Sequence, residues 1–299
     1  MVFLSSAVII SSHRHPNNIV AAFHDSSIAG AGSSTRKAPD VFWFGSAVML
    51  FCYAALLAGI LIATGSWATP GALAKALASR EIQHAVGLTL ATCCLSTLLA
   101  IWVAAPTAYL LSRRKFAGGD LLELLLDLPI VMPPLVVGLG LLLLFQSMPG
   151  RWLENSLGWR FTYTVAGIVL AQFTVSCAFA IRSLRATFDE IPARTENVAR
   201  TLGATDGQVF FHVTLPASRR GLIHAAALAW ARNMGEFGPI LVFAGATRMK
   251  TEVLPTTIFL ELSMGNLEAA ASVSMLLLLA AAVLLVLLRW LHTRMEVSR

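Results

Sequence analysis

The sequence predicts an all-α integral membrane protein with six transmembrane helices. Of its 299 residues, 57% are hydrophobic and 13% are charged, against about 25% charged residues in soluble domains. Crossing the apolar core of a bilayer takes roughly 20 residues of helix. Lipid offers the backbone no hydrogen-bond partners, so only a helix or a closed barrel can span it. Six apolar stretches are long enough: residues 42–64, 85–111, 121–146, 163–182, 221–245 and 270–291.

The lysines and arginines predict the orientation of these spans. With both termini in the cytoplasm, fifteen of the 22 lie in cytoplasmic segments, six lie in the outer loops and Arg232 falls within the fifth span. Cytoplasmic loops of membrane proteins carry an excess of positive charge. We therefore expect an N-in, C-in topology.

The two ends of the chain are expected to lie outside the membrane domain. Residues 1–40 are rich in Ser, Ala and Gly and show no helical stripe, which predicts a disordered cytoplasmic tail. Their apolar opening lacks the basic region of a cleaved signal peptide. Residues 41–292 then form the transmembrane domain, and residues 293–299 form a short cytoplasmic tail.

The third span is interrupted by turn-forming residues. It contains Pro129, Pro133 and Pro134, followed by Gly138 and Gly140. Prolines free backbone carbonyls, which neighbouring helices or a water-lined cavity must then satisfy. The span is therefore either a broken helix of the kind found in transporters or a kinked packing helix.

The fifth span carries charges. Arg232 and Glu236 are four residues apart on one helix face, with Asn233 beside them. Charged residues within a span face the bundle interior, a partner or a cavity. The pair is either a structural ion pair, part of a gate or pathway, or a boundary feature near the headgroups. The segment "LPTTIFLEL" that follows is too short to span and suits a re-entrant or interfacial helix.

Several other classes of function are disfavoured. The four cysteines lie in apolar runs without metal-ligand spacing. The net charge of +6 is explained by the membrane topology, and no basic patch with interleaved aromatics indicates nucleic acid. A membrane-embedded enzyme would need clustered His, Asp or Glu within the spans, and the charged pair of the fifth span, Arg232 and Glu236, supplies a single carboxylate. We expect no catalytic residue and no metal site.

The cytoplasmic connection between the fourth and fifth spans, residues 183–220, is unusually polar. As a helix it would place Glu196, Ala199 or Arg200, and Gly203 on one face, with Val198 and Leu202 as a separate apolar stripe. The chain then turns at "ATDG", and Pro216 is expected to stop the next element. Such a loop either binds a soluble partner or is a solvated connector.

This loop resembles the EAA loop of ABC importer permeases, whose pattern is Glu-Ala-Ala, three residues, Gly, nine residues, Ile, one residue, Leu-Pro. Matching positions are Ala199, Gly203, Val213, Leu215 and Pro216. Asn197 stands at the glutamate position, directly after Glu196, and Val198 replaces the first alanine. Beyond the loop, residues 45–292 resemble molybdate, tungstate and sulfate permeases, with "ARNMGEFGPILVFAG" similar to their fifth span.

The resemblance implies the type I ABC importer permease fold and a bacterial or archaeal cytoplasmic membrane. It implies a second permease copy or paralogue, a cytoplasmic ABC ATPase dimer and an extracytoplasmic oxyanion-binding protein as partners. The chain has no G-x-x-x-x-G-K-[ST] motif, so ATP and Mg are expected on the partner ATPase and no cofactor on this chain. The cargo would be molybdate or sulfate, with tungstate, thiosulfate, iron or polyamine as alternatives.

The resemblance also implies roles for particular residues. A short coupling helix around residues 196–205 would seat in a groove of the ATPase. The ATPase-coupling residues are Glu196, Asn197, Ala199, Arg200, Gly203, Val213, Leu215 and Pro216. The gate or pathway candidates are Arg232, Asn233, Glu236, Pro133 and Pro134. Because Glu236 would neutralise Arg232, we assign that pair to a gate or to packing and not to substrate binding.

Overall fold

The structure is a computed structural model that describes residues 41–115 and 117–297. The expected disordered tail, residues 1–40, lies outside the described residues, as do the last two residues of the expected C-terminal tail. The chain divides into two compact units, Met1–Leu57 and Ala58–Arg299. The described part of the first unit is the beginning of one helix, and all further elements belong to the second unit.

The described residues form helices and no strands, as the sequence predicts. In chain order the elements are α1 (Val41–Trp67), α2 (Pro70–Ala78), α3 (Arg80–Arg113), α4 (Gly119–Val131), α5 (Pro134–Gln146), α6 (Met148–Leu157), α7 (Val165–Asp189), α8 (Ala193–Thr201), α9 (Asp206–Val209), the π-helix η2 (Phe210–Thr214), α10 (Leu215–Ala217), α11 (Arg219–Met234), α12 (Gly238–Phe243), α13 (Leu254–Ser263) and α14 (Leu267–Val297).

Four of the described helices are long and apolar enough to cross a membrane as single spans: Phe42–Trp67, Arg80–Arg113, Val165–Asp189 and Leu267–Leu284. They correspond to the first, second, fourth and sixth predicted spans. The other two predicted spans are broken in the structure. The predicted class, a helical protein with several membrane spans, is therefore confirmed.

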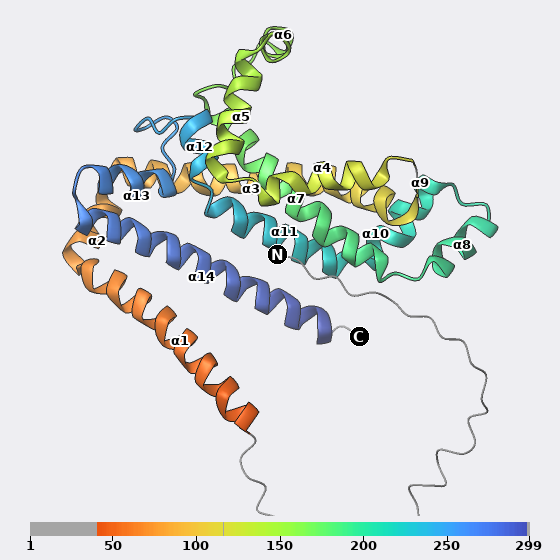
Figure 1. The fold of residues 1–299 in the computed structure, drawn as a ribbon, viewed down its shortest axis with the longest axis horizontal. Coiled ribbons are helices and arrows are strands. Elements are labelled where there is room, and N and C mark those ends of the chain that lie inside the picture. The colour runs from red at the N-terminus through yellow and green to blue at the C-terminus, as the bar shows by residue number, and fades with distance from the viewer. Residues whose placement is uncertain (1–40, 116, 298–299) are drawn as a thin grey trace, which may run out of the picture. The chain divides into compact units, whose positions relative to one another are not determined.

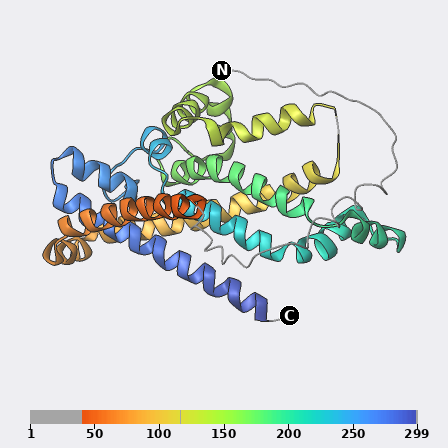
Figure 2. The ribbon, with the colours of Figure 1, turned by 60° about the horizontal axis from the view of Figure 1, so that its bottom comes forward.

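The third predicted span is two helices that meet at a corner. The axes of α4 and α5 differ by 114°, and Figures 1 and 2 show α5 turning away from α4. Met132 and Pro133 are both extended at the corner, with ψ angles of 136° and 135°. Each precedes a proline, whose ring disfavours the helical region for the residue before it. Pro129, by contrast, lies within α4.

The fifth predicted span is divided between α11 and α12. The helix α11 ends at Met234, and α12 begins at Gly238 with Pro239 in its first turn. Pro239 has no backbone N–H to donate to the preceding turn, so the helix cannot run through this point unchanged. The break places Gly235, Glu236 and Phe237 outside regular helix.

Small residues let the central helices of the second unit approach closely. The main buried cluster joins α3, α7 and α11 and includes Ala100, Ala104 and Ala108, then Ala180, and then Ala225 and Ala229. Larger side chains, such as Phe188 and Phe210, fill the end of this cluster nearest η2. Close packing through small residues is typical of membrane helices, because lipid is as apolar as a leucine side chain and gives no hydrophobic drive for helices to associate.

Within this unit, α3 connects two distant groups of elements. Figure 1 shows α13 near one end of α3, and α8 and α9 near the other. At the first end, the backbone N–H of Leu254 in α13 donates to Oγ1 of Thr89 at 2.9 Å. At the second end, Arg113 contacts the loop that the sequence singled out. This loop and the break in the fifth span contain most of the candidate functional residues.

Candidate functional site

The polar loop between α7 and α11 is a series of short helices. The helix α8 ends at Thr201, and Gly203 follows in the left-handed region with φ of +89°. Thr205 then caps α9 in a capping box with Gln208, so that the first free N–H groups of α9 are bonded. The run continues through Pro216 and ends at Ser218. The expected stop at Pro216 is therefore wrong, because proline is tolerated at the start of a helical turn.

The π-helix η2 ends at Thr214, two residues before Pro216. Pro216 has no N–H to donate back into the preceding turn. The N–H of Leu215 instead donates to the carbonyl of Phe210, five residues back. Single π-turns of this kind are often found at functional sites. Here the wide turn includes Thr214, which is fully buried.

Glu196 is held by donors from three elements. It is fully buried, and its Oε1 accepts from Nε of Arg113 and from Oγ1 of Thr214, each at 2.9 Å. Its Oε2 accepts from the hydroxyl of Tyr109 at 3.1 Å and from Nη2 of Arg200 at 3.5 Å. A buried carboxylate needs such compensation, since an unpaired charge is costly in an apolar environment. Glu196 therefore faces the protein interior and not solvent.

The outer face of α8 is uncovered. Val198 is 52% exposed and Leu202 is 84% exposed, and Asn197 and Gly203 are also exposed. The expected strip that joins Glu196 to Gly203 does not form, because α8 ends at Thr201 before Gly203 is reached. Ala199 and Arg200 are half-buried at the side. The surface available to a partner is thus an apolar stripe and a glycine turn.

A second ion-pair cluster lies at the rim of this loop. Asp206 accepts from Nε of Arg200 at 2.9 Å and from Nη2 of Arg114 at 3.0 Å. The hydrogen bond and charge of Arg200, followed by the charge of Arg114, lower the pKa of the Asp206 carboxyl. In turn, the hydrogen bond to Asp206 raises the pKa of Arg200. The cluster connects α9 to α8 and to the end of α3.

The last three residues that match the loop pattern, Val213, Leu215 and Pro216, differ in burial. Val213 is half-buried on η2, and Leu215 is half-buried beside the main core cluster. Pro216 is exposed at the start of α10. The sequence reasoning missed three partners of this loop, Tyr109, Arg113 and Arg114, and one donor within the loop, Thr214. The two arginines were counted only as cytoplasmic charges that set the topology.

The charged pair of the fifth span is formed in the structure. Nη1 of Arg232 lies 2.8 Å from Oε1 of Glu236, and the two side chains are 30% and 1% exposed. The Arg232 guanidinium also lies over the ring of Phe179, 5.7 Å from its centroid, a favourable cation–π position. Arg232 lies in the last turn of α11 and Glu236 lies in the break that follows, so the pair spans this break.

Asn233 connects this break to the central helices. It is buried, and its Nδ2 donates to Oγ1 of Thr97 in α3 at 3.1 Å. Its backbone carbonyl accepts from Nε2 of Gln172 in α7 at 3.4 Å. Gln172 in turn accepts from Oγ of Ser96 at 3.0 Å. The end of α11 is thus fixed by a buried polar network.

Pro133 and Pro134 open α5, and α5 packs on α12 with very little space. A Cβ atom on Gly238 would lie 3.0 Å from Cβ of Pro134, and one on Gly138 would lie 2.8 Å from Cα of Pro239. The structure therefore brings the corner of the third span against the break of the fifth. It does not bring these gate candidates to the loop around α8, from which the length of α11 separates them.

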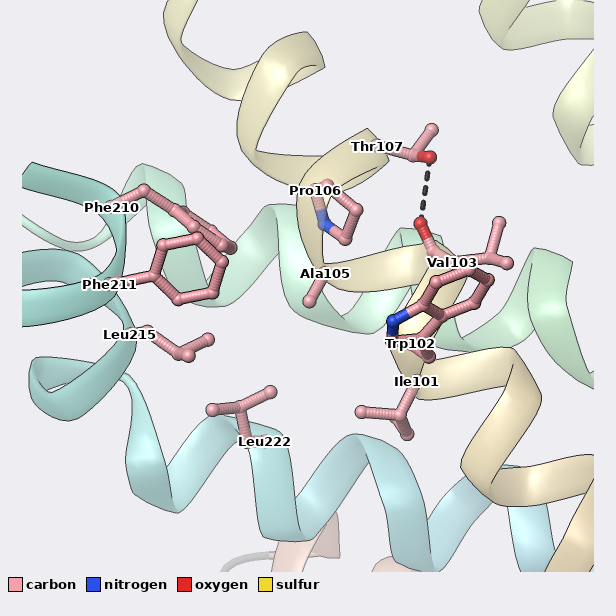
Figure 3. A pocket seen from close by; sticks show the side chains of 10 residues that line it. All are labelled: Ile101, Trp102, Val103, Ala105, Pro106, Thr107, Phe210, Phe211, Leu215 and Leu222. Atoms are coloured by element: carbon pink, nitrogen blue, oxygen red, sulfur yellow. Dashed lines mark hydrogen bonds between the residues drawn. The ribbon is translucent and has the colours of Figure 1, made fainter. Parts of the chain in front are cut away.

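An apolar cavity of about 530 Å³ lies beside the loop. Figure 3 shows Phe210, Phe211 and Leu215 on one side and the α3 residues around Pro106 on the other. Thr107 supplies a hydroxyl, which donates to the carbonyl of Val103 at 2.8 Å. None of the residues that line this cavity is charged. Nor do the described residues contain a group of three or more His, Cys, Asp or Glu able to hold a metal ion.

Comparison with known proteins identifies the family. Residues 96–297 match the family described as "Binding-protein-dependent transport system inner membrane component", which includes the loop, η2 and the broken fifth span. The chain belongs to this family. Its members are membrane translocation subunits, and the predicted ABC importer permease is confirmed.

Relatives of this inner membrane component include three transport permeases. The molybdenum transport system permease protein ModB of Mycobacterium bovis is 38% identical over 197 residues, 65% of this chain and 74% of that protein. The sulfate transport system permease protein CysW of Synechocystis is 35% identical over 224 residues, 74% and 80% of the two chains. The molybdate/tungstate permease protein WtpB of Pyrococcus furiosus is 33% identical over 220 residues, 74% and 82%.

A solved structure shares the fold of this component. A chain of a bacterial alginate ABC transporter, crystallised with a periplasmic protein that carries an alginate pentasaccharide, superposes with a TM-score of 0.65. The match covers 86% of this chain and 92% of that chain at 18% identity. Such low identity carries the fold alone.

Proposed function

We propose that this permease subunit imports an oxyanion, molybdate or sulfate, through the cytoplasmic membrane of a bacterium or archaeon. In this proposal it has six spans, with the third and fifth broken, and both termini are in the cytoplasm. A second copy or a paralogue completes the pathway. ATP and Mg are bound by a cytoplasmic ATPase dimer, and an extracytoplasmic binding protein delivers the anion.

The observation that carries the proposal is the exposed face of α8. Val198 in α8 and Leu202 directly after it present large apolar side chains to solvent, whereas the other residues of α8 are polar or alanine. Gly203 beside them leaves room for another backbone. An apolar stripe on a short helix of a polar loop fits a groove on a soluble partner. The substrate class is supported by the relatives, whose names specify molybdenum, molybdate, tungstate or sulfate.

The mechanism that follows is alternating access. Closure of the ATPases on ATP would draw the two α8 helices together and tilt the spans. The pathway would then open outward, and the binding protein would release its anion between the two permeases. ATP and the loaded binding protein bias one two-state equilibrium from opposite sides.

We assign the ion pair of the fifth span to the gate and not to an anion site. Glu236 neutralises Arg232 at 2.8 Å, so the pair offers a passing anion little net attraction. A strong anion site would also hold the substrate instead of releasing it. Selectivity then resides in the binding protein.

The test is uptake by the reconstituted complex of permease, ATPase and binding protein in liposomes. We expect uptake of labelled molybdate or sulfate that depends on ATP, and its loss in Leu202→Glu. Ala117→Glu, at an exposed position between α3 and α4, serves as the matched control and should transport normally. A complex that takes up neither molybdate, sulfate nor tungstate would contradict the substrate class, and normal transport by Leu202→Glu would contradict the docking face.

Single cysteines test the orientation. In a variant without the four native cysteines, Leu202→Cys should be protected in intact cells from a maleimide that cannot cross the membrane. Met249→Cys, in the exposed turn before α13, should be labelled. The reverse pattern would place the loop outside and refute the topology.

A further inference from the structure

The helix α8 is attached to the rest of the protein mainly through polar side chains. Of its nine residues, Glu196 is the only one that is buried. The chain enters α8 through Pro192 and leaves it through the left-handed turn at Gly203. Ile191, just before Pro192, packs against the main core cluster, and Arg200 is joined to Arg114 at the end of α3 through the exposed Asp206. Within α8 itself, Glu196 is therefore the buried contact through which a displacement of the helix reaches the spans.

The contacts of Glu196 lead to one helix above all. Arg113 and Tyr109 both belong to α3, and their distances from the carboxylate are 2.9 Å and 3.1 Å. Nη2 of Arg113 also donates to the carbonyl of Ile191 at 3.0 Å, which fixes the entry to α8. The end of α3 is thereby joined to both the start and the middle of α8.

The helix α3 in turn contacts the break in the fifth span. Its Thr97 accepts from Asn233 at 3.1 Å, next to the ion pair of Arg232 and Glu236. Farther along, its Thr89 accepts from the backbone of Leu254 at 2.9 Å. A single helix of 34 residues thus connects α8, the break and α13.

We propose that Glu196 is a positioning residue for coupling, and that its buried pair with Arg113 transmits the movement of α8 to α3 and so to the gate. Glu196 acts from inside the permease, since its carboxylate is fully buried and both oxygens already accept hydrogen bonds. Separating Glu196 from Arg113 would leave an uncompensated buried charge, so the pair stays intact while α8 moves. This inference rests on the proposed function, in which an ATPase moves α8.

The experiment is a double-mutant cycle on the reconstituted complex. The variants are Glu196→Gln, Arg113→Gln and the pair together, and the readout is anion transported per ATP hydrolysed. Each single variant should keep the ATPase subunit bound and lower this ratio about tenfold, within the usual range of coupling free energies. The double variant should lose no more than either single variant, because both remove the same interaction.

Two further variants separate positioning from folding. Glu196→Asp keeps a carboxylate with a shorter reach and should recover part of the ratio. Glu190→Gln, at an exposed position after α7, should match the wild type. Wild-type transport per ATP in Glu196→Gln, or additive losses in the double variant, would overturn the inference and leave the proposed function standing.

A purely structural role would give a different result. In that case Glu196→Gln would lose the ATPase subunit, and transport and hydrolysis would fall in proportion, which also overturns the inference. Absence of ATP-driven uptake by the wild-type complex would instead refute the proposed function itself. The two failures are therefore distinguishable.

Discussion

The contact between the two broken spans gives the sharpest prediction. A Cβ atom on Gly138 would lie 2.8 Å from Cα of Pro239 and 3.0 Å from its carbonyl oxygen. Because those atoms belong to a backbone, α5 and α12 must separate when Gly138 becomes alanine. Overpacking of this kind costs about 1–3 kcal/mol. Gly140, two residues along the same helix, has no atom within 4 Å of the corresponding position.

The comparison of Gly138→Ala with Gly140→Ala isolates this cost. Both substitutions gain the same helix propensity, up to about 1 kcal/mol, so their difference reports the contact with α12. We expect Gly138→Ala to be less stable than Gly140→Ala by about 1–3 kcal/mol in denaturant unfolding of the purified protein. It should also transport less, since the contact holds the candidate gate. Equal stability of the two variants would refute the close approach of α5 and α12.

Three further changes test the other sites. Arg232→Ala leaves the Glu236 carboxylate buried without its counter-charge, so we expect a loss of about 3–5 kcal/mol in unfolding experiments; a wild-type unfolding midpoint would contradict the pairing. A Cβ at Gly203 would meet nothing within 4 Å, so Gly203→Ala should cost only the left-handed strain of the backbone, about 1–2 kcal/mol. Gly203→Asn should cost less, because asparagine adopts the left-handed region more readily; equal costs would show that the backbone strain is absent. Burial raises the pKa of the Glu252 carboxyl, so its stabilising contribution is full below the unfolded value of about 4.3 and is lost as pH rises through the higher folded value. Glu252→Gln should therefore gain melting temperature over the wild type between pH 4 and pH 8, and a constant difference would contradict the raised pKa.

The sequence predicts the helical class and the positions of the spans, but not the geometry of the breaks. Its proline run marks the third span as interrupted. It does not show that Pro129 stays within α4 while Met132 and Pro133 make a corner of 114°. The difference arises because two consecutive prolines restrict two successive residues, whereas a single proline in a helix costs one hydrogen bond that neighbours can replace.

The loop pattern identifies the family, but it does not predict that the Glu196 side chain faces the protein interior. Gly203 and the Leu215-Pro216 pair match by spacing alone, and their local structure follows from residues nearby. The partners of Glu196 in α3 are 83 and 87 residues away in the sequence, so no local pattern could place the side chain inward. Its burial is a property of the tertiary fold.

The two buried glutamates are held with different strength, and this difference assigns them different behaviour during transport. Glu196 accepts from four donors on three elements, whereas Glu236 pairs with Arg232 alone, beside a break closed by backbone bonds of 3.1 Å and 3.2 Å. We expect the contacts of Glu196 to stay intact, and the pair of Glu236 with Arg232 to separate, when ATP binds. Hydrogen exchange of the complex should then change at residues 235–237 between the nucleotide-free and ATP-bound states and stay constant where α3 meets α8. Faster exchange at the α3–α8 contact with a constant rate at the break would reverse this assignment and place the moving joint at the loop.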